Sequence, residues 1–160
     1  FRRSNADLKF ILAKSYLNNK DPENAKTQCL ELLKEKELYN ISLLPGQNES
    51  TQMVTEQKIE ALLADAYFEL NDFDNSMEHY RRAHDRNLGS WERPFYSLSI
   101  VDCLIGMKRF EEAKNRLKRT KWEFEKEEVY KDDKVIFSGE QKFERQDWLA
   151  LVEQRKELIP

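Results

Sequence analysis

Apolar and small residues recur every three or four positions along most of the chain, which is the pattern of amphipathic helices. The clearest stretch is 61–83, where two such periods flank a polar turn at Asn71–Asp72. Small side chains at Ala64, Ser76 and Ala83 alternate there with bulky aromatic ones. Such alternation lets two helices approach closely. The stretch therefore predicts a helical hairpin, which needs neighbours of its own kind to bury both of its faces.

The same periodicity predicts further helices on both sides of this hairpin, spanning approximately residues 6–18, 22–37, 95–106, 109–127 and 140–158. Four residues of the first helix are expected to face the core: Leu8, Ile11, Leu12 and Tyr16. Asp21 is expected to cap the second helix, with Pro22 at its first position. The stretch 38–55 contains proline, glycine and several polar residues and is expected to be a loop. The short apolar run 135–137 predicts a strand-like strip or a buried loop.

The residue order of the central hairpin resembles the tetratricopeptide repeat, a helix–turn–helix unit with a 34-residue period. In the copy at 57–90 the signature positions are held by Leu63, Ala64, Tyr67, Phe73, Ser76, Tyr80 and Ala83. Two further copies fit 6–39 and 94–127, so that Ala25, Ser76 and Ala113 are equivalent and lie 51 and 37 residues apart. The tryptophan near the start and the proline near the end of the family's repeat are absent from all three copies.

The resemblance implies an all-α fold, a right-handed superhelical solenoid of helix–turn–helix repeats. Three repeats would occupy residues 1–130, with an insertion at about 38–55. Residues 131–160 would add a short apolar strip and a C-terminal helix that caps the stack. The alternative for that helix is the start of another repeat.

Composition and charge narrow the class of partner. The charged fraction of 36% is balanced in sign and gives a net charge of -3, so no broad field attracts nucleic acid. The basic run at 114–121 is interpreted as a solvated helix face because glutamates flank it, and Glu112 is placed to pair with Arg116. No apolar run reaches the roughly 20 residues that cross a bilayer, so no membrane partner is expected. The chain begins with Phe1 and is expected to be a piece of a longer protein.

No residue pattern indicates catalysis. The two histidines, His79 and His84, are five residues apart, a spacing that does not place two metal ligands on one helix face; they are expected at the surface and at a helix end. Cys29 and Cys103 lack CxxC spacing and are expected to be buried thiols, which suits the cytoplasm or nucleus. Phosphate-binding and nucleophile motifs are also missing. We therefore expect no enzyme activity, no cofactor and no metal.

The resemblance implies that a partner binds in a concave groove lined by the first helix of each repeat. Eight residues are predicted to contact it: Phe10, Lys14, Leu17, Leu62, Asp65, Phe68, Phe95 and Asp102. Because this surface is mainly apolar with scattered charges, an amphipathic helix or peptide is the favoured ligand. One subfamily grips chaperone C-terminal tails with a Lys–Asn–Asn–Lys–Arg clamp. The five corresponding positions do not reproduce it, so chaperone tails are disfavoured: Phe10, Lys14, Leu62, Phe95 and Ser99.

These observations favour a non-catalytic protein-interaction or scaffold segment of a larger intracellular multiprotein complex. Three alternatives stay open. The groove could be filled by the chain itself, through the 38–55 loop, the 135–137 strip or further repeats. The groove or the N-terminal face could instead join two copies into a homodimer. The segment could also be an accessory domain of a larger enzyme.

Overall fold

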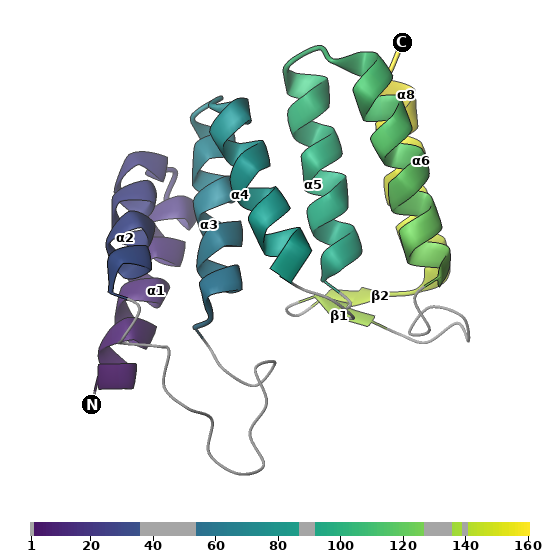
Figure 1. The fold of residues 1–160 in the computed structure, drawn as a ribbon. Helices are drawn as coiled ribbons and strands as arrows, with labels where there is room; N and C mark the ends of the chain where they lie inside the picture. The colour runs from purple at the N-terminus through teal and green to yellow at the C-terminus, as the bar shows by residue number, and fades with distance from the viewer. Residues whose placement is uncertain (1, 36–53, 87–91, 127–135, 139–140) are drawn as a thin grey trace. The chain divides into compact units, whose positions relative to one another are not determined.

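The computed structural model describes residues 2–35, 54–86, 92–126, 136–138 and 141–160 (Figure 1). Their regular secondary structure is helical apart from one short pair of strands. The elements are α1 (Arg2–Asn18), α2 (Pro22–Lys34), α3 (Glu56–Glu69), α4 (Phe73–Arg86), α5 (Arg93–Gly106), α6 (Phe110–Lys126), β1 (Ile136–Ser138), β2 (Gln141–Phe143) and α8 (Arg145–Leu158). The loop expected at 38–55 lies outside the described residues except at its end, where Thr55 caps α3 by accepting a hydrogen bond from the Lys58 backbone N–H.

The chain forms two compact units, Phe1–His79 and Tyr80–Pro160, and the division falls within α4. The first unit holds α1, α2, α3 and the beginning of α4. The second holds the rest of α4 together with α5, α6, the strands and α8. The division of the sequence into three repeats followed by a terminal segment stays a prediction.

The three helical hairpins share one turn geometry. A residue with positive φ ends the first helix of each hairpin: Lys20 (62°), Asn71 (59°) and Lys108 (59°). The next backbone N–H reaches back to close the turn, from Asp21 to Tyr16, from Asp72 to Tyr67 and from Arg109 to Leu104, each at 2.9 Å. This is the Schellman arrangement, which satisfies the last carbonyls of a helix. The three turns are 51 and 37 residues apart, the same spacings as the equivalent small residues of the sequence pattern.

Side-chain caps then start the second helix of the first two hairpins. The Asp21 carboxylate accepts a hydrogen bond from the Asn24 backbone N–H, with Pro22 at the first helical position, as predicted. Asp72 accepts from the Asn75 backbone N–H in the same way. These aspartates satisfy N–H groups that a helix start leaves unpaired.

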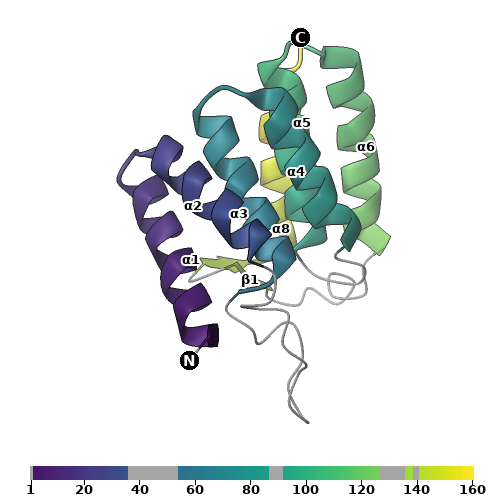
Figure 2. The same ribbon diagram turned by 60° about the vertical axis from the view of Figure 1, so that its left-hand side comes forward.

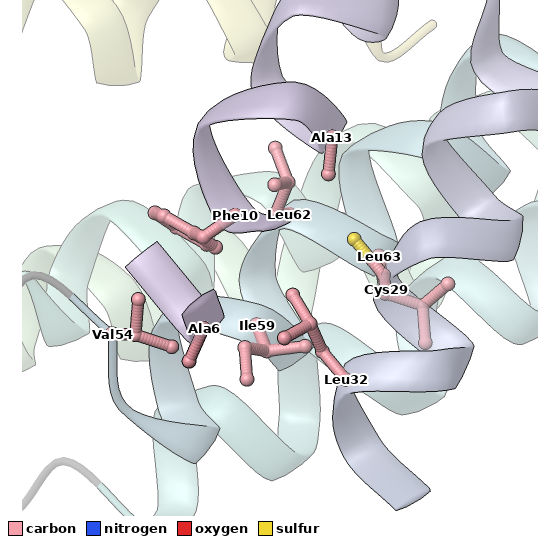
Figure 3. Packing of buried hydrophobic residues seen from close by; sticks show 9 residues of the cluster. All are labelled: Ala6, Phe10, Ala13, Cys29, Leu32, Val54, Ile59, Leu62 and Leu63. Atoms are coloured by element: carbon pink, nitrogen blue, oxygen red, sulfur yellow. The ribbon is translucent and has the colours of Figure 1, made fainter. Parts of the chain in front are cut away.

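The core of the first unit gathers side chains from α1, α2 and α3 (Figure 3). Its buried members are Ala6, Phe10, Ala13, Cys29, Leu32, Val54, Ile59, Leu62 and Leu63. The residues that α1 contributes to this core are Phe10 and the small residues Ala6 and Ala13, not the larger aliphatic residues of the helix. The small residues let α1 approach α2 closely, which bulky branched side chains would prevent.

The inward face predicted for α1 is therefore wrong in three of its four residues. Leu8, Ile11 and Leu12 are 63%, 46% and 42% exposed, while Tyr16 is half-buried. α1 carries two apolar faces, and the periodicity alone did not distinguish the one that packs.

The α3–α4 hairpin is joined by close contacts between small and aromatic residues. The Ser76 hydroxyl, fully buried, donates to the Ala64 carbonyl at 2.8 Å. Tyr67 stacks on the His79 ring with centroids 5.4 Å apart, and Phe68 meets Phe73 edge to face at 5.2 Å. The small–aromatic alternation of the sequence thus produces the close approach that it predicts.

In the second unit α8 packs against both α5 and α6 (Figure 2). Its Trp148 is fully buried, stacked on Phe124 at 4.2 Å and meeting Phe95 edge to face at 5.1 Å. This helix begins at Arg145 rather than near residue 140, because 141–143 pairs antiparallel with 136–138, Ile136 opposite Phe143. The strand-like strip expected at 135–137 is thus β1, and the helix start predicted at 140 is wrong.

Candidate partner-binding surfaces

Two of the predicted contact residues in the first unit are core residues. Phe10 and Leu62 are only 6% and 8% exposed and belong to the cluster of Figure 3. Their side chains hold α1 and α3 to the rest of the unit. Burial leaves them little surface to offer a partner, so they support the surface from beneath.

The other four predicted residues of the first unit remain at the surface. Lys14 is exposed, and its Nζ lies 5.5 Å from the centroid of the Phe10 ring. Leu17 is half-buried against the core, and Asp65 and Phe68 are half-buried on α3. Lys14 and Leu17 lie 51 residues before Asp65 and Phe68, so the pairs occupy equivalent positions on two first helices. The helices α1 and α3 contact each other, and each of the four side chains remains at least partly accessible.

The two predicted contact residues of the second unit are both covered by α8. Phe95 packs against Trp148, as described above. The carboxylate of Asp102 accepts two hydrogen bonds from Arg155, Nε to Oδ1 at 3.0 Å and Nη2 to Oδ2 at 3.1 Å. The chain thus fills this part of the predicted groove itself. It does so with its C-terminal helix rather than with the segments considered in the sequence analysis.

The surface position predicted for His79 is wrong, whereas His84 lies in the last turn of α4, at a helix end as predicted, and is buried there. His79 is 9% exposed, and its Nδ1 lies 2.5 Å from Oε2 of the buried Glu60 on α3. His84 is 1% exposed and contacts Glu123 on α6 through Nε2, at 3.1 Å. α4 therefore uses one histidine in each unit to bind a buried glutamate. No spacing in the sequence links residues 19 and 39 positions apart, so only the packed fold shows these pairs.

The buried Glu123 stays ionised because its neighbours compensate for its burial. Burial by itself raises the pKa of this carboxyl, but the hydrogen bond with His84 and the electrostatic interactions with His84, Arg116 and Arg119 outweigh it. The pKa of Glu123 therefore lies below its ordinary value. Arg119 contributes directly through a 3.0 Å ion pair.

The basic run on α6 is partly used inside the unit. Arg116 donates to the buried Ser97 hydroxyl at 3.0 Å, and burial lowers the pKa of its guanidinium. The sequence predicted a pair between Glu112 and Arg116. In the structure the Glu112 carboxylate instead accepts hydrogen bonds from Nε and Nη2 of Arg109, at 2.8 and 2.6 Å. The remaining lysines of the run are exposed, as expected for a solvated helix face.

Both cysteines are buried, as predicted. Burial, with a smaller contribution from the charge of Asp65, raises the pKa of the Cys29 thiol to about 12. In the described ranges no three His, Cys, Asp or Glu side chains gather where they could hold a metal ion. Over the same part of the chain, every helix is too short or too polar to cross a membrane.

Comparison with known proteins supports the resemblance. The tetratricopeptide repeat family model matches residues 61–87, which lie in the α3–α4 hairpin. The crystal structure of a TPR-like protein from Chlorobium tepidum TLS matches with a TM-score of 0.58 at 17% identity, over 99% of this chain and 97% of that one. No curated protein matches the sequence. The α3–α4 hairpin is thus similar to a tetratricopeptide repeat, and the fold is all-α and TPR-like.

Proposed function

We propose that this chain is a non-catalytic protein-interaction segment of a larger intracellular complex, and that it binds a partner helix or peptide on the surface shared by α1 and α3. Tetratricopeptide repeats in general mediate protein–protein interactions. One observation carries the proposal: Lys14 and Leu17 on α1 occupy the same repeat positions as Asp65 and Phe68 on α3, and none of the four is fully buried.

The chemistry of these four residues, hereafter the groove surface, defines the ligand. Leu17 and Phe68 offer apolar contacts, and Lys14 and Asp65 bring charges of opposite sign. An amphipathic helix with apolar anchors at helical spacing suits such a surface. Its charges would be acidic near Lys14 and basic near Asp65, because complementary charges fix the register of a partner.

A contact within the second unit supports this choice of charge. Asp102 is the repeat equivalent of Asp65, 37 residues further on, and it binds the guanidinium of Arg155 from α8. Paired hydrogen bonds between arginine and a carboxylate are among the stronger polar contacts in proteins. An arginine of the partner helix facing Asp65 would repeat this contact.

Phe68→Glu tests the proposal. The variant places a charge among the apolar contacts, and we expect it to lose the proteins that the native chain captures from cell extract. Trp122→Glu on α6 is the matched control, since it makes the same kind of change at a residue that is 58% exposed. Circular dichroism checks that both variants are folded. If Phe68→Glu captures the same proteins with the same affinity as the native chain, the groove surface is not the binding site.

A further inference from the structure

Three of the five exposed large apolar residues among those described lie on α1, outside the groove surface. They are Leu8, Ile11 and Leu12, and these three residues are hereafter the α1 outer face. The other exposed large apolar residues among those described, Trp122 and Leu158, are single residues on helices whose exposed positions are otherwise mainly charged. A contiguous apolar patch of this kind marks an interaction site more often than scattered residues do.

The equivalent positions on α3 show what covers the same face of that helix. Counting 51 residues forward from the α1 outer face reaches Ile59, Leu62 and Leu63 on α3. These are 0%, 8% and 0% exposed. They pack against α2, whose Cys29 and Leu32 belong to the same cluster (Figure 3). The same positions are thus buried on α3 and exposed on α1.

α8 repeats the arrangement. Its residues Trp148, Leu151 and Val152 have the same spacing as Ile59, Leu62 and Leu63. Trp148 and Val152 are 0% and 4% exposed, and α8 packs against α6, the helix before it among those described, and against α5. Among the described helices, these positions thus lie on a helix that packs against the helix before it in each unit.

We infer that the α1 outer face is a docking surface for an amphipathic helix of a partner protein whose contact face has the chemistry of α2. That contact face has small or aliphatic residues at positions equivalent to Ala25, Cys29 and Leu32, all fully buried here. The inference continues an interface that the structure already contains, between α2 and α3, onto the next equivalent helix. The three residues of the α1 outer face do not belong to the groove surface, which adjoins this face at Lys14, three positions after Ile11. The inference does not depend on the proposed function.

Charge distinguishes this partner helix from α2 itself. Asp65 on α3 is close enough to α2 for its charge to act on Cys29. The equivalent position on α1 is Lys14, of opposite sign. The partner helix is therefore expected to carry an acidic residue close to its equivalent of Cys29, because that charge would face a lysine instead of an aspartate.

A second copy of the chain offers no helix of this kind among the described residues. The small and aliphatic faces of its second helices are already used within their own units. Their buried residues include Ala25, Cys29 and Leu32 on α2, Ser76, Met77 and Ala83 on α4, and Ala113 and Leu117 on α6. A second copy could only bring its own α1 outer face, which has large aliphatic residues and lacks the small ones.

The test uses a peptide with the sequence of residues 22–35, with Cys29→Ala to prevent oxidation. A covalent link between two side chains of its exposed face holds it helical, because an isolated helix of this length is marginal in water. The full chain is labelled with ¹⁵N and titrated with the peptide. We expect chemical-shift changes concentrated at residues 7–15. Shifts that are absent up to millimolar peptide, or concentrated elsewhere, overturn the inference.

Variants of the chain and peptide make the assignment specific. Ile11→Glu should weaken peptide binding about tenfold or more, as expected for a central contact, while Trp122→Glu should leave it unchanged. Lys14→Asp restores the α3 arrangement and should tighten binding of this α2 sequence. A peptide carrying Ala25→Glu and Leu32→Glu should not bind. Equal binding by Ile11→Glu and the native chain contradicts the inference.

Sedimentation of the chain alone tests whether a second copy of the chain occupies the α1 outer face. We expect that the α1 outer face does not join two copies of the chain, so that the mass stays that of a monomer as the concentration rises. A dimer that Ile11→Glu dissociates and Trp122→Glu does not would show that a second copy occupies the α1 outer face, and the inference of a partner helix would be wrong.

Discussion

Arg155 and Asp102, 53 residues apart in sequence, form a two-point contact that joins the C-terminal helix to α5. Both side chains are mostly withdrawn from water, at 21% and 29% exposed, and the parallel hydrogen bonds fix the angle of the guanidinium. The contact therefore determines how α8 lies on α5 and keeps Asp102 from an external partner.

Removing this contact should destabilise the second unit. We expect Arg155→Ala to lower the free energy of unfolding by about 1–2 kcal/mol, since hydrogen bonds to charged groups are worth somewhat more than neutral ones. Urea denaturation measures the change. The control is Lys156→Ala, whose 3.8 Å pair with Glu153 is exposed and should contribute less than about 0.5 kcal/mol. Equal effects of the two variants would mean that the Arg155 contact is merely a surface ion pair.

Trp148 is the main anchor of α8. Because it is fully buried between Phe95 and Phe124, Trp148→Ala should cost about 3–5 kcal/mol. Trp122→Ala, at a residue that is 58% exposed, should change stability by no more than about 0.5 kcal/mol. Thermal denaturation followed by far-ultraviolet circular dichroism compares the two. A small effect of Trp148→Ala would show that α8 is not held to α5 and α6 through this side chain.

The close approach of α3 and α4 depends on the size of residue 76 more than on its hydroxyl. Ser76 is fully buried against the Ala64 carbonyl. Ser76→Ala keeps the size, and we expect a loss of about 1 kcal/mol or less. Ser76→Leu should cost more, about 1–3 kcal/mol, because the enlarged side chain forces the helices apart. The reverse order in denaturant midpoints would contradict close packing as the cause.

Glu123 should make stability depend on acid. Its pKa is lower in the folded protein than the ordinary 4.5, so its contribution is fully present above that value and is lost as pH falls through the folded pKa. Glu123→Gln should therefore be less stable than the native chain at pH 7, and the difference should shrink below pH 4.5. Unfolding free energies measured between pH 7 and pH 3 test this, with the exposed Glu125→Gln as control. A difference that does not vary with pH would exclude the carboxylate charge as its source.

The thiols should be inert in the folded protein. Burial raises the pKa of Cys29 to about 12, and the reactive species is the thiolate. Cys103 is fully buried as well. A colorimetric disulfide reagent at pH 8 should label neither cysteine until urea is added, after which both react. Rapid labelling of Cys29 without urea would show that α2 separates readily from α3.

The α3–α4 hairpin and the start of α2 were readable from the sequence because their signals are local. Ala64, Tyr67 and Ser76 mark a helical hairpin by size and spacing alone, and Asp21 with Pro22 marks a helix start. Tight turns and caps depend on a few neighbouring residues, which a single sequence shows directly.

Contacts between distant segments could not be read in the same way. α1 has two apolar faces, and only the helices packed around it decide that Phe10 is buried while Leu8 is exposed. The pairing of His84 with Glu123 likewise depends on how α4 meets α6. The covering of Asp102 by Arg155 required the position of α8, which the periodicity of that helix did not specify.

Hydrogen–deuterium exchange, with and without a partner that the native chain captures and Phe68→Glu does not, tests the groove surface most directly. We predict that partner binding slows exchange in the segments of α1 and α3 that contain Lys14, Leu17, Asp65 and Phe68, with little change in α6. Protection confined to α6 or α8, with α1 and α3 unchanged, would contradict the account.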